Sequence, residues 1–195
     1  AYFAFTTDQG AFTVENVLQV SDYAFVFVRS IWLALIATAI CLLIAYPLAS
    51  ILSRMNGNHQ RMFLMLVMLP MWMNFLLRTY AWMTLLEGKG IINSILGFFG
   101  LGPLNMINTS GAVVLGMVYN YLPFMILPLY SVMTKISKGV IEAAQDLGCN
   151  SFGVFRRVVI PLSVPGITTG IIMVFVPSLS TFIISRMLGG GTSPL

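Results

Sequence analysis

Residues 138–162, KGVIEAAQDLGCNSFGVFRRVVIPL, form a polar, amphipathic stretch between two long apolar segments. The rest of the chain is strongly apolar, since 58% of the 195 residues are hydrophobic and 8% are charged. Soluble domains carry about 25% charged residues, so this chain has too few charges to cover a globular surface. The composition therefore predicts a protein whose outer surface faces lipid, with the polar stretch held outside the membrane.

Four segments are long and apolar enough to cross a bilayer, which takes about 20 residues. The predicted spans are residues 30–53, 62–86, 111–134 and 158–185. A fifth apolar segment, residues 90–102, is shorter and interrupted by glycines, which predicts an interfacial or re-entrant helix. The predicted fold class is all-α, a polytopic transmembrane helical bundle. Prolines within the spans are compatible with it, because neighbouring helices or water can satisfy the freed backbone groups.

The basic residues predict the orientation of the bundle. Six of the ten Lys and Arg residues lie in two segments on one side, residues 54–61 and 135–157. The positive-inside rule assigns that side to the cytoplasm, so both ends of the given chain are expected outside. The net charge of +4 is scattered along loops, which favours membrane orientation over nucleic-acid binding. The expected location is the bacterial plasma (inner) membrane, in a multi-pass arrangement.

No residue pattern predicts catalysis, a metal site or a bound cofactor. Cys41 and Cys149 lie in different settings, an apolar run and a polar loop, which argues against a disulfide or a protein-only metal site. The segment LEGKGI lacks the upstream glycine and the hydroxyl of a phosphate-binding loop, and GGGTS lacks the lysine. His59 is expected to be a solvated turn residue. The chain is therefore not expected to be an enzyme.

The polar loop, residues 135–161, predicts two short helices joined by a tight turn. Ser137 is the expected N-cap of the first helix and Gly148 its stop, while Ser151 is expected to cap the second. Pro161 marks the return to the membrane. Each helix carries one apolar face at helical spacing, formed by Val140, Ile141, Ala144 and Leu147 on the first and by Phe152, Phe155 and Val159 on the second.

Two acidic residues of this loop favour a basic partner. Glu142 and Asp146 are four residues apart and share a helix face, where like charges are mildly destabilising in isolation. A solvated amphipathic loop is the simplest alternative.

The loop resembles the EAA loop of binding-protein-dependent ABC importer permeases. That pattern is Glu-Ala-Ala, three residues, Gly, nine residues, then aliphatic-x-aliphatic-Pro, with Val158 and Ile160 here in place of the usual Ile and Leu. The positions that match are Glu142, Ala143, Ala144, Gly148 and Pro161. The resemblance implies that residues 1–195 form the transmembrane domain of a type I ABC importer permease. It implies that residues 135–161 are a cytoplasmic coupling-helix loop.

The resemblance also implies the partners. The loop would dock on a dimer of ATP-binding subunits, which would bind ATP and Mg, so no cofactor is expected in this chain. A second permease subunit would complete a heterodimer, and an extracellular or periplasmic substrate-binding protein would deliver the cargo. Members of the family have six spans, so the first and last spans are expected to be missing here.

Longer segments indicate the cargo. LPMWMNFLLRTYAW (residues 69–82), residues 121–148 and MLGGGTSPL near the end are similar to the first permease subunit of spermidine/putrescine importers. The implied function is the permease subunit of an ATP-driven polyamine importer, forming half of the translocation pathway. The same machinery with another small solute, such as a phosphonate, iron or an amino-acid-like molecule, is the alternative. An ATP-independent secondary transporter or channel would normally carry ionisable groups at the midplane or a selectivity ring, and a structural anchor would leave the interrupted spans unexplained.

Aromatic and amide side chains on the spans are candidates for the pathway of a polycation. A cation over an aromatic ring gains roughly 0.5–2 kcal/mol. The candidates are Trp72, Asn74, Tyr80, Trp82, Tyr119, Asn120 and Tyr121. Helix packing and interfacial anchoring are the alternative role, because Trp and Tyr collect at membrane surfaces. Arg78, the one charge inside a predicted span, is expected to have a structural or gating role, since it would repel a polycation.

Overall fold

The computed structural model describes residues 24–88, 90–98 and 105–180, with side chains from residue 28 onward. Within these ranges the secondary structure is helical, without a strand, which confirms the all-α fold class. Both chain ends, residues 99–102 of the fifth apolar segment and residues 181–185 of the last predicted span lie outside the described residues.

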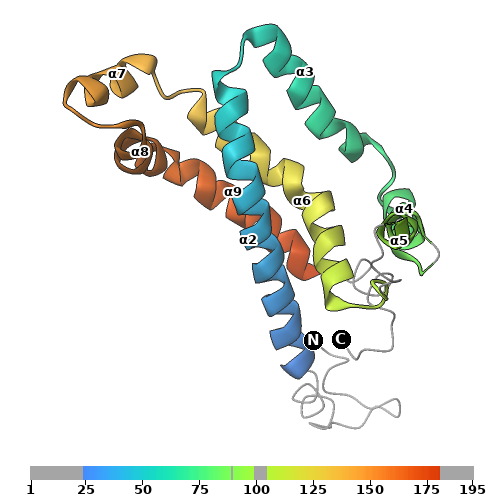
Figure 1. Cartoon of the computed structure of the whole chain (residues 1–195). Coiled ribbons are helices and arrows are strands. Elements are labelled where there is room, and N and C mark those ends of the chain that lie inside the picture. The colour runs from blue at the N-terminus through green and yellow to red at the C-terminus, as the bar shows by residue number, and fades with distance from the viewer. Residues whose placement is uncertain (1–23, 89, 99–104, 181–195) are drawn as a thin grey trace.

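Three long helices pack against one another and form the bundle (Figure 1). They are α2 (Ala24–Arg54), α6 (Ser110–Met133) and α9 (Ile160–Ser180). The helices long and apolar enough to cross a membrane are Val28–Arg54, Ser110–Met133 and Ser151–Ser180, and the last includes the residues that precede α9. Three of the four predicted spans are therefore confirmed in their described parts.

Small residues line the face of α2 that packs into the bundle. These residues recur every three or four positions and are fully buried: Ala34, Ala37, Cys41, Ala45 and Ala49. Lipid tails are as apolar as the side chains, so helices in a membrane associate through close packing, which small residues permit. The regular spacing of this row therefore determines which face of α2 meets α6 and α9.

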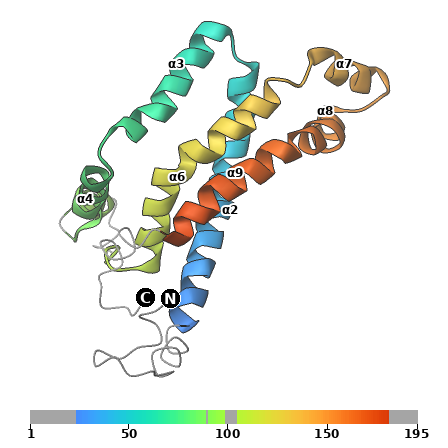
Figure 2. The same ribbon diagram turned by 180° about the vertical axis from the view of Figure 1, so that it is seen from behind.

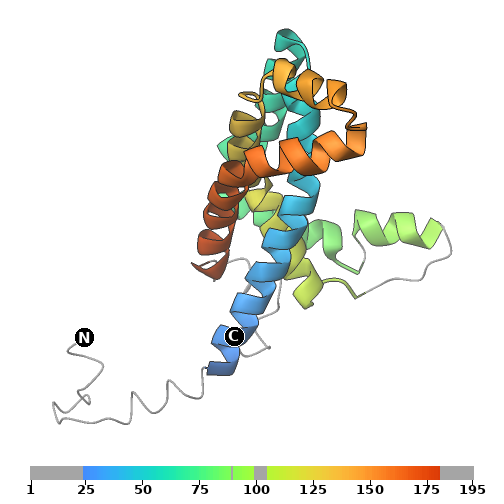
Figure 3. The same cartoon turned by 90° about the vertical axis from the view of Figure 1, so that its left-hand side faces the viewer.

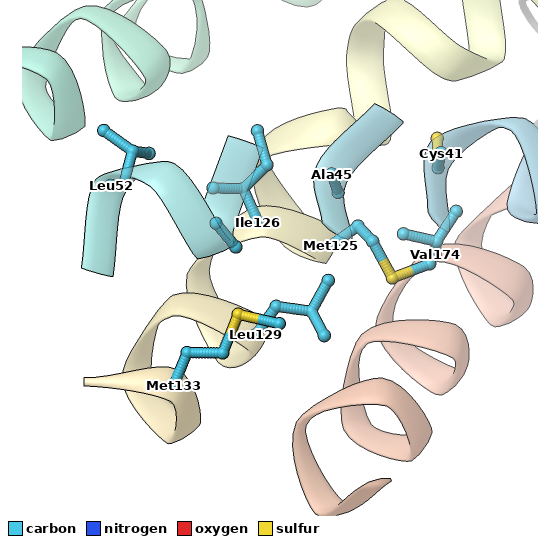
Figure 4. Packing of buried hydrophobic residues seen from close by; sticks show 9 residues of the cluster. Cys41, Ala45, Leu52, Met125, Ile126, Leu129, Met133 and Val174 are labelled. Atoms are coloured by element: carbon cyan, nitrogen blue, oxygen red, sulfur yellow. The ribbon is translucent and has the colours of Figure 1, made fainter. Parts of the chain in front are cut away.

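Glycines give α9 the same close approach to α6. A Cβ atom on Gly166 would lie 3.0 Å from the backbone oxygen of Pro128, and one on Gly170 would lie 2.6 Å from the sulfur of Met125. Figure 4 shows Met125 reaching from α6 toward Val174 of α9. Methionine side chains adapt to irregular gaps, which suits a contact between helices this close.

The remaining predicted span, residues 62–86, is not one continuous helix. It contains α3 (Gly57–Met68), the short 3-10 helix η3 (Leu69–Trp72) and α4 (Phe75–Leu86). The helical segments Gly57–Trp72 and Phe75–Phe98 meet at an angle of 92°, so together they form either a broken span or a re-entrant loop. Figure 3 shows the second segment running across the direction of α2.

Two residues explain the break. Pro70 has no backbone N–H to donate, so it interrupts the α-helical hydrogen-bond pattern in the preceding turn. Asn74 then starts a new helix, since its side chain accepts a hydrogen bond of 2.8 Å from the backbone N–H of Leu76.

A glycine turn joins α4 to α5 (Ile91–Phe98). The carbonyl oxygen of Glu87 accepts hydrogen bonds from the backbone N–H of Gly90 at 2.7 Å and from Nδ2 of Asn93 at 3.0 Å. A Cβ atom on Gly90 would lie 2.5 Å from the backbone oxygen of Leu85, so a larger residue does not fit. The short helix predicted in residues 90–102 is thus confirmed over the part described.

The polar loop lies at the same end of the bundle as the turn between α2 and α3 (Figures 1 and 2). It contains α7 (Lys138–Asp146), α8 (Ser151–Val154) and η4 (Phe155–Val159), a π-helical turn that leads directly into α9. The prediction of two short helices is confirmed. The two segments with most of the basic residues therefore share one end of the molecule.

The contact between α6 and α9 predicts that the same substitution destabilises the chain at Gly166 but not at Gly139. Gly166→Val should destabilise the purified chain by roughly 1–3 kcal/mol, because the added atoms meet a backbone oxygen that cannot rotate away. Gly139→Val on α7 is the matched control, since no atom lies within 4 Å of a Cβ built there. Thermal unfolding in detergent measures both, and equal midpoints would contradict the close-packing account.

Candidate functional site

Helix α7 is amphipathic but is not packed into the bundle. None of its residues is buried. A helix of nine residues is too short to be stable alone in water, so it needs either neighbouring packing or a binding partner. The polar loop is therefore a candidate site for the docking of a partner protein.

The turn after α7 explains two residues of the sequence pattern. Gly148 has φ of +84°, which residues with a Cβ rarely adopt. Its N–H donates to the carbonyl of Gln145 at 2.8 Å, and the N–H of Cys149 donates to the carbonyl of Ala144 at 3.1 Å. This is a Schellman motif, in which two otherwise free carbonyls at the helix end are satisfied. The predicted helix stop at Gly148 is confirmed.

The N-terminal caps differ from the prediction. Ser137 occupies the N-cap position of α7, but its side chain makes no capping hydrogen bond. Ser151 is not the cap of α8, because it is already the first residue of that helix. Asn150 is the cap, and its Oδ1 accepts a hydrogen bond of 2.8 Å from the N–H of Gly153. An Asn side chain is as effective a cap as Ser, and Asn150 holds the extended conformation that a cap requires.

The predicted apolar face of the second helix is divided. Phe152 is 69% exposed, whereas Val159 is buried and Phe155 packs edge-on against Tyr46 with ring centroids 5.7 Å apart. The π-helical turn Phe155–Val159 changes the number of residues per turn, so positions on either side of it no longer share a face. The prediction of one face through these three residues is wrong for this reason.

Large apolar side chains project from the polar loop into the surroundings. Leu147 is 87% exposed and Phe152 is 69% exposed, and they flank the turn that joins α7 to α8. They line a cavity of about 650 Å³ together with Arg156 and Arg157. Apolar side chains exposed on a polar loop are typical of a surface that another protein covers.

The acidic residues of α7 face the surroundings too. Glu142 and Asp146 are exposed, and neither forms an ion pair within the part of the chain that the structure describes. Glu142 lines a polar cavity of about 680 Å³, together with Lys138 and with Arg54 at the end of α2. The cavity lies between α7 and the ends of α2 and α6.

The seven candidate pathway residues do not form one group. The rings of Trp82 on α4 and Tyr119 on α6 meet edge to face, with centroids 5.3 Å apart. Asn120, the next residue along α6, is buried. Tyr121 packs partly buried against the bundle core. Trp72 and Tyr80 are exposed, and Asn74 caps α4. Only Trp82 and Tyr119 are brought into ring contact across α4 and α6, and a role in a pathway stays a prediction for all seven.

Two buried polar groups lack partners among the described residues. Nε and Nη1 of Arg78 are buried without a hydrogen-bond acceptor, and so is Oδ1 of Asn120 without a donor. The amide nitrogen of Asn120 does donate, to the carbonyl of Gly116 at 2.8 Å. Unsatisfied buried groups cost free energy, so Arg78 has a reason to bind an acceptor from outside the described residues.

The contact between Tyr46 of α2 and Ser163 of α9 was not anticipated from the sequence. Their side-chain oxygens lie 3.0 Å apart, and Ser163 is fully buried. A tyrosine and a serine 117 positions apart carry no local pattern that pairs them.

Among the described residues, no group of three or more His, Cys, Asp or Glu side chains could hold a metal ion.

Comparison with known proteins identifies relatives along nearly the whole chain. Residues 13–194 match the family described as binding-protein-dependent transport system inner membrane component. The chain is 43% identical to the spermidine/putrescine transport system permease protein PotB of Haemophilus influenzae, over 91% of this chain and 64% of the relative. It is 38% identical to PotB of Escherichia coli K12, over 94% of this chain and 68% of the relative.

A third relative carries a less specific name. The inner membrane ABC transporter permease protein YdcU of Escherichia coli K12 is 33% identical over 84% of this chain and 57% of that protein. The chain thus spans about two thirds of the length of the two PotB relatives and less of the third.

The unpaired guanidinium of Arg78 leads to a stability prediction. Arg78→Met should stabilise the purified chain by roughly 1–3 kcal/mol, because it removes buried donors that lack acceptors among the described residues. Arg54→Met is the control, since Arg54 is exposed and its loss should change stability by less than about 0.5 kcal/mol. Thermal unfolding in detergent compares the two, and a loss of stability in Arg78→Met would mean that the guanidinium already has a partner in this chain.

Proposed function

Because the chain belongs to the family of binding-protein-dependent transport system inner membrane components, we propose that it is a permease subunit of an ATP-driven polyamine importer. The observation that carries the cargo assignment is the 38–43% identity to two proteins named as spermidine/putrescine permeases. The chain contributes half of the translocation pathway. ATP is hydrolysed by a separate subunit, which binds the nucleotide and Mg.

Residues 135–161 are the coupling loop in this proposal. The exposed position of α7 supports this assignment, as do the apolar side chains of Leu147 and Phe152, which a partner would remove from water. Arg156 and Arg157 beside them favour an acidic rim on the ATP-binding subunit. Within the matching pattern, Gly148 shapes the turn and Ala144 supplies the carbonyl that closes it.

The membrane orientation in this proposal follows from the basic residues. The loop and the turn between α2 and α3 lie at the same end and carry Arg54, Lys138 and the two arginines of η4. Positively charged loops are retained in the cytoplasm, where the ATP-binding subunits are. The opposite end of α6 then faces the external binding protein.

The aromatic pair at the contact of α4 and α6 is the best-supported part of a cation pathway. Trp82 and Tyr119 offer ring faces, and Asn120 offers a buried amide oxygen without a donor. A second permease subunit would complete the pathway and cover exposed residues such as Trp72 and Tyr80. Arg78 has a structural or gating role in the assembled transporter and takes its acceptor from the second permease subunit.

A different small solute on the same machinery is the second candidate. The observation in its favour is the third relative, which is 33% identical and is named as an ABC transporter permease without a cargo. Selectivity would then be decided mainly by the external binding protein.

Reconstitution tests the proposed function. The chain, in its full natural form, is assembled with the ATP-binding subunits, second permease and binding protein of its own system in proteoliposomes. ATP-dependent uptake of radiolabelled spermidine or putrescine is expected, with unlabelled polyamine competing. Uptake of another solute class but no polyamine would favour the second candidate. Uptake that does not require ATP would overturn the proposal.

The left-handed backbone at Gly148 predicts a separation of ATP hydrolysis from transport. Gly148→Val strains the turn by about 1–2 kcal/mol, which should lower uptake on the order of tenfold while ATP hydrolysis continues. The bundle should stay folded, because no other atom lies within 4 Å of a Cβ at this position. Gly148→Asn is the matched variant, since Asn tolerates this conformation and should keep most of the uptake. Full uptake by Gly148→Val would count against the coupling role.

A further inference from the structure

The π-helical turn Phe155–Val159 lies where the loop enters the membrane helix. The N–H of Ile160 donates to the carbonyl of Phe155, five residues earlier, in place of the usual four. Pro161 follows immediately; it has no N–H to donate, and its ring crowds the carbonyl of Arg157 four residues before it. The proline of the sequence pattern thus favours a widened, more compliant turn at this point.

Tyr46 of α2 contacts both sides of this turn. Its ring packs edge-on against Phe155 with centroids 5.7 Å apart and planes at 89°, which is before the widened residues. Its hydroxyl lies 3.0 Å from Oγ of Ser163, which is after them. One side chain from a neighbouring helix therefore bridges the turn.

The direction of the hydrogen bonds follows from the number of protons. Oγ of Ser163 donates to the carbonyl of Ile160 at 2.9 Å. A serine hydroxyl has one proton, so Tyr46 is the donor to Ser163. The chain Tyr46 to Ser163 to Ile160 ends on the residue whose N–H closes the π turn. Ser163 is fully buried, and hydrogen bonds away from water are strong and reinforce one another.

Tyr46 also lies next to a position where the backbone hydrogen bonding of α2 is interrupted. Pro47 lies inside that helix directly after Tyr46, and it removes a backbone hydrogen bond to the carbonyl four residues earlier. Helix α7 itself has no buried residue, and a cavity of about 680 Å³ separates it from the ends of α2 and α6. The main packing contacts of α7 are with α8 and η4, so displacement of the loop is passed on through these two elements.

We propose that the Tyr46–Ser163 hydrogen bond is the positioning contact that passes displacement of the loop at residues 135–161 to α2. The inference rests on the proposed function, because it assumes that the loop is driven by an ATP-binding subunit. Tyr46 and Ser163 touch neither nucleotide nor cargo in this mechanism. They keep α2 and α9 moving together when force on the loop bends the π-helical turn.

The experiment measures how many ATP molecules are hydrolysed for each cargo molecule imported by the complete transporter in proteoliposomes. Tyr46→Phe removes only the hydroxyl and keeps the ring on Phe155. Ser163→Ala removes the acceptor. Each should raise the ratio of ATP to cargo roughly two- to tenfold, the range that one hydrogen bond supports. The double variant should be no worse than the more severe single variant, because all three lose the same contact.

Two controls separate coupling from ordinary loss of stability. Ser178→Ala removes a buried hydroxyl of the same helix that donates only within it, to the carbonyl of Val174 at 2.7 Å, and Tyr130→Phe removes a tyrosine hydroxyl of α6. Both should keep the wild-type ratio. Hydrogen exchange of the amides from Phe155 to Ser163 provides a second measurement, and Tyr46→Phe should speed it.

The outcomes separate a failure of the proposed function from a failure of the positioning role. If the wild-type transporter imports no polyamine, the proposed function fails before the variants are compared. If the wild type imports it and both single variants keep its ratio, the positioning role is overturned. Effects that multiply in the double variant would also overturn it, since the two residues would then act separately.

Discussion

Close approach between three apolar helices is the constraint on which the described structure depends. In lipid no difference in hydrophobicity drives helices together, so α2, α6 and α9 associate by fitting their surfaces. The row of small residues from Ala34 to Ala49 lets α2 approach, and Gly166 lets α9 approach the backbone of α6. The larger side chains, Met125 among them, then fill the space that remains.

This packing decides what lies next to the loop. With α2 and α9 in contact, Tyr46 reaches across to Ser163, and the turn widened by Pro161 is supported from the side. The loop itself stays outside the bundle, with Leu147 exposed. A loop that is exposed along α7 but anchored at its second half, where Val154 and Val159 are buried, suits the transmission of force from a partner.

The arm from α3 to α5 has fewer buried residues and takes a different course. No residue of α3 is buried, and the break at Pro70 and Asn74 turns the following helix across the bundle. The arm packs on the bundle mainly through α4, where Leu86 is buried with Leu33 and Val113 and where Trp82 meets Tyr119 on α6. Many of its other apolar residues, Trp72 among the most exposed, have surfaces available to lipid or to another subunit. For this reason the predicted pathway residues separate into a packed set and an exposed set.

Local patterns in the sequence predict much of this molecule. Composition and run length identify three spans, because burial in lipid depends on apolar content alone. The stop at Gly148 and the short helix in residues 90–102 also follow from local residues. The proposed partner and cargo come from the resemblance of the loop and of longer segments to a known family, not from such physical patterns.

The tertiary structure decided the remainder. Run length could not show that the segment over residues 62–86 bends, since apolar content is the same in a straight and a broken helix. The helical period could not predict the divided face at Phe152, because the π turn shifts every later position. The pairing of Tyr46 with Ser163 depends on which faces of α2 and α9 meet, and that is settled by the whole set of close contacts between helices far apart in the chain.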